Sequence, residues 1–336
     1  LVLEELEPYI ELHLRAMIGD IRKPVSIYGK FDNTLPRVGE YDYDMIEGVI
    51  TRLVGIGKSE ESLDLEKARE EASKLAPRRS LPFCPGCPHR GTYTALRQAL
   101  RELGYTEDDV IVTGDIGCTI LGMNPPFNVC WTEVCMGSSI GLAIGLRYAG
   151  IDRPIIATIG DSTFFHAGIP PTINASWYNT NILIAVLDNQ ITAMTGHQPS
   201  PSSGYTATGE KAPEIKIESL IEAAGIKKVT VVDPYDLRRT KEAFLEALQE
   251  KGPSAIVLRR MCSLVARRMG LREKAARVDI EGCTGCQLCI RTLSCPSMSI
   301  AANGKTVIDP ATCTGCDLCT QVCPSAAITR EGAGHD

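Results

Sequence analysis

Eight of the 14 cysteines in this 336-residue chain lie between Cys283 and Cys323. They form two runs of one pattern: three cysteines spaced as Cys-x2-Cys-x2-Cys, followed within a few residues by a Cys-Pro pair. Such a run brings three thiolates to one [4Fe–4S] cluster, and its last cysteine reaches a second cluster. Zinc and disulfides fit less well, because zinc sites use two pairs of ligands and disulfide frameworks are typical of short secreted chains. The segment therefore predicts a small module built around two iron–sulfur clusters.

The crossing of the fourth cysteine assigns the ligands of each cluster. The first set comprises Cys283, Cys286, Cys289 and Cys323, and the second set comprises Cys295, Cys313, Cys316 and Cys319. The first run departs from the usual spacing, because five residues instead of three precede Cys295. The two halves are an internal duplication. We expect residues 278–330 to fold as a small α+β domain of the bacterial 2[4Fe–4S] ferredoxin type.

Composition and charge narrow the class of protein further. The hydrophobic content of 44% allows a sizeable core. No apolar run reaches the roughly 18–20 residues of a membrane-spanning helix. A net charge of −6 and an aromatic content of 5% argue against a nucleic-acid partner. The acidic first residues do not resemble a signal peptide, and clustered reduced cysteines indicate a reducing, anaerobic setting, so we expect a cytoplasmic protein without a membrane partner.

The middle of the chain, residues 81–262, alternates between strand-like and helix-like segments. Short, apolar, β-branched stretches occur at 110–113, 154–159, 181–187 and 255–258, and helical patterns separate them. This alternation is typical of an α/β domain with a parallel sheet. The sequence therefore predicts an α/β domain followed by the cysteine-rich module.

The segments around this domain carry weaker signals. Residues 1–80 read as an N-terminal arm and linker, the remnant of a preceding domain, with an amphipathic helix over 1–17, a short strand at 25–28 and a solvated helix over 60–75. Residues 263–277 form a basic linker before the cysteine-rich module. This linker is either a helix with a solvated face or a docking strip for an acidic partner.

Polar residues follow two of the predicted strands at the point where each strand ends. Gly160, Asp161 and Ser162 follow one strand, and Asn189 follows the next. Ligands bind at the carboxyl ends of parallel strands, and a hard divalent cation prefers oxygen ligands. The Asp161 carboxylate, the Asn189 amide oxygen and the backbone carbonyl near Ile191 fit that preference, and the helix after Gly160 offers N–H groups to a phosphate. The alternative is an ordinary strand-end turn with an ordinary Asn cap.

These residues resemble a known family. The Gly-Asp-Ser string at 160–162, together with the Asp-Asn pair at 188–189, looks like the thiamine diphosphate signature. Longer strings resemble the large (alpha) subunit of indolepyruvate:ferredoxin oxidoreductase: FCPGCPHRGT (83–92), GDIGC (114–118), CMGSSIG (135–141), GDSTFFHAGIPPTINA (160–175) and DNQITAMTGHQ (188–198).

The resemblance implies that residues 81–262 are a thiamine diphosphate-binding domain. It further implies that Asp161, Asn189 and the Ile191 carbonyl hold Mg²⁺, and that Gly137, Ser138 and Ser162 lie near the diphosphate.

Four further cysteines resemble the ligands of a third cluster. In related 2-oxoacid:ferredoxin oxidoreductases, a CPGC pair, a downstream Gly-Cys and a late cysteine hold a [4Fe–4S] cluster close to thiamine. This chain offers a candidate for each position, the third set: Cys84, Cys87, Cys118 and Cys262. The alternative is a cysteine-containing turn and two small buried hydrophobic residues.

Two histidines are candidates for proton transfer or for binding the substrate carboxylate. His89 follows the CPGC pair and His166 follows Gly-Asp-Ser, so both are predicted near the same strand ends. The alternative for each is a hydrogen-bonded structural histidine.

The resemblance implies oxidative decarboxylation of a 2-oxoacid, an aryl pyruvate such as indolepyruvate, to acyl-CoA and CO₂. Electrons would pass to ferredoxin, with coenzyme A as acyl acceptor and a small second (beta) subunit as partner. The family's subunit is nearly twice as long, and its pyrimidine-binding half has no match here. We therefore expect a hetero-oligomer in which that half is a separate chain, or a fragment that lacks it. The alternatives are an electron-transfer subunit without its own catalytic site and a non-redox thiamine decarboxylase.

Overall fold

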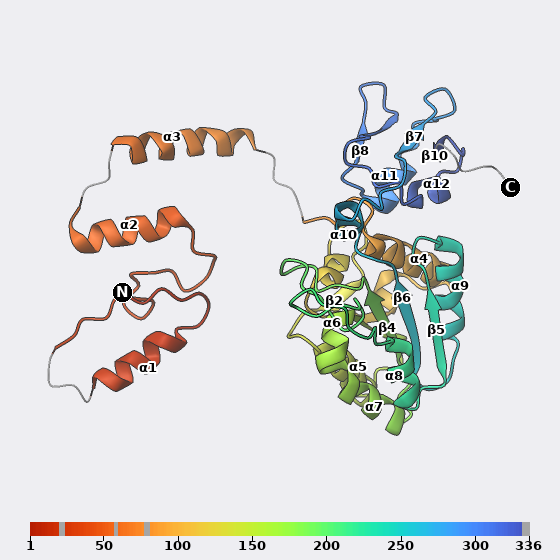
Figure 1. Cartoon of the computed structure of the whole chain (residues 1–336), viewed down its shortest axis with the longest axis horizontal. Coiled ribbons are helices and arrows are strands. Elements are labelled where there is room, and N and C mark those ends of the chain that lie inside the picture. The colour runs from red at the N-terminus through yellow and green to blue at the C-terminus, as the bar shows by residue number, and fades with distance from the viewer. Residues whose placement is uncertain (20–23, 57–59, 77–80, 331–336) are drawn as a thin grey trace. The chain divides into compact units, whose positions relative to one another are not determined.

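The structure is a computed structural model that describes residues 1–19, 24–56, 60–76 and 81–330. The chain divides into two units, Leu1–Arg79 and Ser80–Asp336 (Figure 1). Parts of the predicted arm, residues 20–23, 57–59 and 77–80, lie outside the described residues. Within the described parts of the chain, every helix is too short or too polar to cross a bilayer.

The N-terminal unit contains three helices: α1 (Tyr9–Ile18), α2 (Tyr43–Val54) and α3 (Glu60–Leu75). The prediction of a helix over residues 1–17 was wrong at its start. Pro8 immediately precedes α1, and proline is tolerated at a helix start but not inside a helix. The predicted strand at 25–28 was also wrong, since residues 24–28 have no regular structure.

A buried carboxylate organises this N-terminal unit. Glu11 is fully buried, and its carboxylate accepts hydrogen bonds from the Arg15 side chain and from the Lys30 backbone N–H at 2.6 Å. It thereby ties the loop around Lys30 to α1. Many apolar side chains of α1 remain exposed, including Tyr9, Ile10 and Met17. The unit therefore has little apolar core of its own.

A six-stranded parallel sheet forms the centre of the second unit, with strand order β2-β1-β3-β4-β6-β5 (Figure 1). Its strands are β1 (Ile111–Thr113), β2 (Cys130–Thr132), β3 (Ile155–Gly160), β4 (Leu183–Asp188), β5 (Lys228–Val232) and β6 (Ser254–Arg259). The predicted parallel α/β architecture and its four strands are confirmed. The sequence missed β2 and β5, which are the two edge strands and are only partly buried, so neither reads as a continuous apolar run.

Helices cover both faces of this sheet because its central strands are apolar on both sides. In β4, Leu183 and Leu187 pack into one core, whereas Ile184 and Val186 pack into the other. Two helices, α4 (Pro88–Glu102) and α9 (Leu237–Leu248), contribute to the first core. The second core contains residues of α5 (Ser138–Tyr148), α7 (Ile169–Trp177) and α8 (Ile217–Ala223).

Short helical segments connect these elements near the strand ends. They are η1 (Glu107–Asp109), η2 (Cys118–Met123), α6 (Asp161–Thr163), the π-helical turn η3 (Phe164–Gly168) and α10 (Ser263–Arg268). The predicted basic linker, residues 263–277, thus begins as α10 and ends at the first strand of the cysteine-rich module.

The cysteine-rich module is α+β, as predicted. It contains β7 (Ala276–Val278), α11 (Leu288–Leu293), β8 (Met298–Ile300), β9 (Thr306–Ile308), α12 (Leu318–Val322) and β10 (Ile328–Arg330). Two antiparallel pairs, β7 with β10 and β8 with β9, repeat one arrangement, as the duplicated sequence requires. Leu293 and Leu318 belong to the same core as α4, so the module packs on that face of the sheet.

Candidate functional site

The ends of β3 and β4 form one edge of a small cavity. The two strands are neighbours in register, with Gly160 opposite Leu187, so the residues that follow them meet. The resulting strand-end cavity, of about 100 Å³, is lined by Gly160, Asp161, Ser162, Asn189 and Ile191, among others. The structure therefore brings together the five residues that the sequence placed at these two strand ends.

Asp161 is a buried carboxylate, and among the described residues no cationic side chain pairs with it. Its Oδ2 accepts hydrogen bonds from the Ser200 and Ser202 hydroxyls, at 3.0 and 3.1 Å. Burial raises the pKa of Asp161 to about 7, and the nearby Asp188 carboxylate contributes to the rise. A bound cation would favour the ionised form, so this site suits a divalent metal ion. Sequence reasoning missed Ser200 and Ser202, which lie far from Asp161 along the chain.

His89 and Asn189 contact each other inside the same cavity. The Asn189 Nδ2 lies 3.4 Å from the His89 Nε2, and the Asn189 Oδ1 accepts the Ile191 N–H at 3.2 Å. Burial lowers the pKa of His89 to about 4, so the imidazole is neutral at pH 7. With the amide NH₂ donating, Nε2 is the acceptor and Nδ1 carries the proton, a tautomer assigned from the hydrogen bond. A neutral His89 cannot bind a carboxylate as a cation.

His166 lies elsewhere. It is exposed on the π-helical turn η3 and is absent from the lining of the strand-end cavity. The structure therefore does not bring His166 together with His89.

The loop that holds Gly137 and Ser138 is organised by a residue that sequence reasoning did not single out. Asp115, fully buried, accepts the Gly137 N–H at 2.9 Å and the Ser139 N–H at 3.2 Å. The Ser138 hydroxyl donates to the Cys135 carbonyl at 2.8 Å. Polar groups of Gly137 and Ser138 are thus already bonded within the protein, and neither residue lines the strand-end cavity. The only signal for Asp115 was its place in the string GDIGC.

The four cysteines of the third set lie near one another. Burial is the main cause that raises the pKa of Cys118 to about 11, and the thiols of Cys262 and Cys84 add to the shift. Burial is also the main cause that raises the pKa of Cys87, and the thiols of Cys118 and Cys84 raise it further. Cys118 also lines the strand-end cavity, and the Cys262 N–H donates to the Asn189 carbonyl at 3.0 Å. The third set therefore reaches that cavity through Cys118 and through the backbone of Cys262.

The first and second sets each line a cavity of their own within the module. All four cysteines of the first set line one cavity, and all four of the second set, Cys295 included, line another. Within the described parts of the chain, no three His, Cys, Asp or Glu side chains converge as ligands of a single metal ion do. Four thiols around a cavity suit a cluster instead, because several irons keep the ligands farther apart than one ion does.

The cavity of the second set also contains polar atoms without partners. Among the described residues, four buried atoms in its lining have no hydrogen-bond partner: Arg90 Nε, Ser297 Oγ, Thr314 Oγ1 and Asp317 Oδ1. Buried polar atoms in native proteins are nearly always hydrogen-bonded. Several unpaired ones in a single cavity indicate that the cavity is built to hold a polar group.

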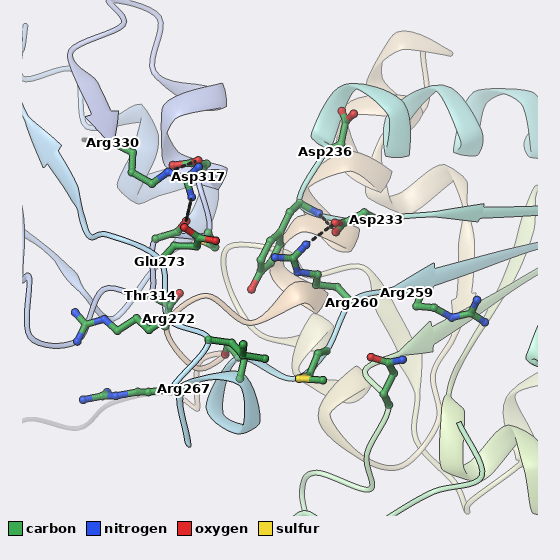
Figure 2. A pocket seen from close by; sticks show the side chains of 18 of the residues that line it. Asp233, Asp236, Arg259, Arg260, Arg267, Arg272, Glu273, Thr314, Asp317 and Arg330 are labelled. Atoms are coloured by element: carbon green, nitrogen blue, oxygen red, sulfur yellow. Dashed lines mark hydrogen bonds and ion pairs between the residues drawn. The ribbon is translucent and has the colours of Figure 1, made fainter. Parts of the chain in front are cut away.

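A larger cavity, of about 770 Å³, lies between the module and the strand ends of the α/β domain (Figure 2). Arg267 and Arg272 of the predicted basic linker line it, and Arg272 donates to the Cys313 carbonyl at 3.0 Å. Arg260 pairs with Asp233 at 2.8 Å. The linker is therefore partly engaged in packing the module, and its use as a docking strip stays a prediction.

Comparison with known proteins finds matching family models and similar proteins. The family "Thiamine pyrophosphate enzyme, C-terminal TPP binding domain" matches residues 115–258, and the family "4Fe-4S binding domain" matches residues 306–329. Indolepyruvate oxidoreductase subunit IorA of Methanothermobacter thermautotrophicus is 40% identical over 334 residues, 99% of this chain and 52% of that subunit. This chain is similar to the IorA subunits over nearly its whole length. It spans about half the length of the curated relatives that it matches.

More distant relatives agree with this similarity. The beta subunit of 2-oxoacid:ferredoxin oxidoreductase from Saccharolobus solfataricus is 26% identical over 54% of this chain and 61% of its own length. A solved structure of 2-oxoglutarate:ferredoxin oxidoreductase from Magnetococcus marinus aligns with a TM-score of 0.51 at 22% identity, over 55% of this chain and 66% of that one. At this identity the structural match supports the fold alone. The predicted resemblance and fold class are confirmed.

Proposed function

We propose that this chain is the thiamine- and cluster-binding part of a 2-oxoacid:ferredoxin oxidoreductase. The reaction would convert a 2-oxoacid and coenzyme A into acyl-CoA and CO₂. Two electrons would reduce two ferredoxins, and the thiol proton of coenzyme A would be released, so that atoms and charges balance. An aryl pyruvate such as indolepyruvate is the substrate class we propose, from the name of the relatives.

One observation carries this proposal: the third set of cysteines reaches the cavity that contains Asp161 and Asn189. Cys118 lines that cavity, and the backbone of Cys262 is hydrogen-bonded to Asn189. Thiamine diphosphate, when bound, supplies the electron sink for decarboxylation. A cluster held by the third set would supply a one-electron acceptor beside it. A non-redox decarboxylase has no need of such an acceptor.

The chain's own residues would bind Mg²⁺ and fix the orientation of the side chains that hold it. Asp161 and Asn189, with the Ile191 carbonyl, would hold Mg²⁺, and Ser200 and Ser202 fix the Asp161 carboxylate by hydrogen bonds. His89, neutral and buried, fixes the orientation of the Asn189 amide.

Two further parts of the site hold the loops and the remaining clusters. Asp115 fixes the loop before α5 through the Gly137 and Ser139 N–H groups. Gly86, within the CPGC loop, lines the cavity of the second set, so the third and second sets adjoin. The first and second sets would hold the two clusters of the module.

The proposal also concerns partners. We propose that a pyrimidine-binding half, on a separate chain or in another part of a longer protein, completes the thiamine site. We propose that this half, a small beta subunit and ferredoxin are the partners of this chain in a hetero-oligomer.

Ferredoxin reduction tests this function. The anaerobically purified complex should reduce ferredoxin when given a 2-oxoacid, coenzyme A and thiamine diphosphate, with indolepyruvate compared against pyruvate and 2-oxoglutarate. Cys118→Ser should abolish ferredoxin reduction, whereas Cys130→Ser, a buried cysteine outside all three sets, should preserve it. Release of CO₂ without ferredoxin reduction would instead indicate a non-redox decarboxylase.

The second candidate is an electron-transfer subunit without its own catalytic site. The observation that favours it is that eight cysteines line the two cavities of the ferredoxin-like module, which suits electron transfer by itself. Under this alternative the complex would accept electrons from a reductant but would not respond to any 2-oxoacid.

A further inference from the structure

Arg90 is a buried cation without a carboxylate partner among the described residues. It follows the CPGC pair on α4 and is only 1% exposed, which makes it one of the largest fully buried side chains. Its hydrogen bonds go to backbone carbonyls: to Phe83 at 2.5 Å, to Cys84 at 3.3 Å and to Leu293. An unpaired buried charge is costly, so something else in the holoprotein must carry the compensating negative charge.

Arg90 adjoins two different cysteine sets. It lines the cavity of the second set, together with all four cysteines of that set. It also donates a hydrogen bond to the carbonyl of Cys84, in the third set, at 3.3 Å. One buried guanidinium is therefore shared by both sites.

The hydrogen bonds of Arg90 also connect the two sets mechanically. One nitrogen binds the carbonyls of Phe83 and Cys84, at the start of the CPGC loop, and the other binds the carbonyl of Leu293, two residues before Cys295. The third nitrogen, Nε, is fully buried and has no partner among the described residues. Arg90 lines the cavity of the second set, where an acceptor for that N–H is missing.

We propose that Arg90 is a positioning residue shared by the third and second cluster sites, and that its charge stabilises their reduced forms. This inference rests on the proposed function, because it assigns clusters to both cysteine sets. A cluster bound by four thiolates is an anion, and its potential depends on net charge and on hydrogen bonds to its sulfurs. Reduction adds one more negative charge, so a fixed cation nearby favours the reduced state. Sequence reasoning passed over Arg90 because its neighbours come from distant segments.

Redox titration followed by electron paramagnetic resonance tests this proposal on the anaerobically purified complex. In Arg90→Gln, we expect the equilibrium constant for one-electron reduction of each of the two adjoining clusters to fall at least tenfold. This corresponds to a reduction potential that is lower by about 59 mV. The first set, Cys283, Cys286, Cys289 and Cys323, should keep its potential and serves as an internal reference. Arg90→Lys, which keeps the charge, should restore most of the effect. Arg97→Gln is the matched control, because Arg97 lies on the same helix but pairs with Glu107 at 2.7 Å.

The outcomes separate the proposal from its rivals. An Arg90→Gln protein with full iron content and unchanged potentials would overturn it. If Arg90→Lys shifts the potentials as much as Arg90→Gln does, the carbonyl hydrogen bonds matter rather than the charge, and the charge role is refuted. If Arg90→Gln does not accumulate, Arg90→Lys decides: potentials within tenfold of wild type support the proposal, and a larger shift refutes it.

Failure of the proposed function would look different. If the wild-type complex contains only the two clusters of the module, the third-set assignment fails. A shift in Arg90→Gln confined to the second-set signal would then still support the role of Arg90 toward that set, and no shift would refute it.

Discussion

Replacing Asp161 by asparagine should stabilise the thiamine-free protein while removing its Mg²⁺ site. Burial holds the pKa of this carboxyl at about 7, against an ordinary value of 3.8. At about 1.36 kcal/mol for each pKa unit, ionising it inside the fold costs roughly 4 kcal/mol. The asparagine side chain would carry no charge, so we expect Asp161→Asn to unfold with a free energy higher than wild type by up to that amount at pH 8.

The pH dependence fixes the sign of this effect. A carboxyl whose pKa is raised in the folded state binds protons more tightly there than in the unfolded chain. Its stabilising contribution is therefore complete below pH 4 and is lost as the pH rises to about 7. Wild-type stability should fall across that window, and the fall should be smaller in Asp161→Asn.

Denaturant unfolding between pH 5 and pH 8 measures both effects, on iron-loaded protein freed of thiamine and Mg²⁺. Asp152→Asn is the matched control, because the Asp152 side chain is fully exposed and its loss of charge should leave the slope unchanged. Addition of Mg²⁺ and thiamine diphosphate should stabilise wild type but not Asp161→Asn. An Asp161→Asn protein that is no more stable than wild type at pH 8, with the same pH slope, would refute the reasoning.

Single residues elsewhere in the second unit give three further predictions. Gly137→Ala should destabilise the protein by at least about 1–2 kcal/mol in denaturant unfolding, because Gly137 has a φ of +87° and an added Cβ would overlap Ala167. Cys118→Ser should lower the iron content by about four atoms per chain, one cluster, whereas Cys130→Ser should leave it unchanged; equal iron in both variants would contradict a cluster at the third set. His89 should not titrate between pH 5 and 8, since its pKa is about 4, and a histidine resonance of wild type that moves in this range and is lost in His89→Asn would contradict that.

The local patterns in the sequence predicted much of the fold and part of the site. The strands that end at Gly160 and Asp188 are apolar on both faces, so their parallel pairing and the meeting of Asp161 with Asn189 could be read from pattern and topology. The cysteine spacing similarly predicted which residues line each cavity of the module. These features follow from the spacing of residues within each run and from the pairing of neighbouring strands, both of which a sequence pattern can indicate.

The features that sequence reasoning missed depend on contacts between distant segments. Asp115 owes its role to N–H groups more than 20 residues away, and Ser200 reaches Asp161 from a loop 39 residues further on. Arg90 donates a hydrogen bond to the carbonyl of Leu293, 203 residues further along the chain. His166 is exposed on a π-helical turn, and the residue pattern did not indicate that turn.

The central claim is that this chain contributes a thiamine site and three clusters to one oxidoreductase. Iron and thiamine assays on a single anaerobically purified sample of the native complex test it most directly, together with identification of the co-purifying chains. We expect about one thiamine and about 12 irons per chain, at four irons for each cluster, with a pyrimidine-binding partner present. About eight irons with no thiamine and no such partner would exclude a thiamine site and a third cluster and would indicate an electron-transfer subunit.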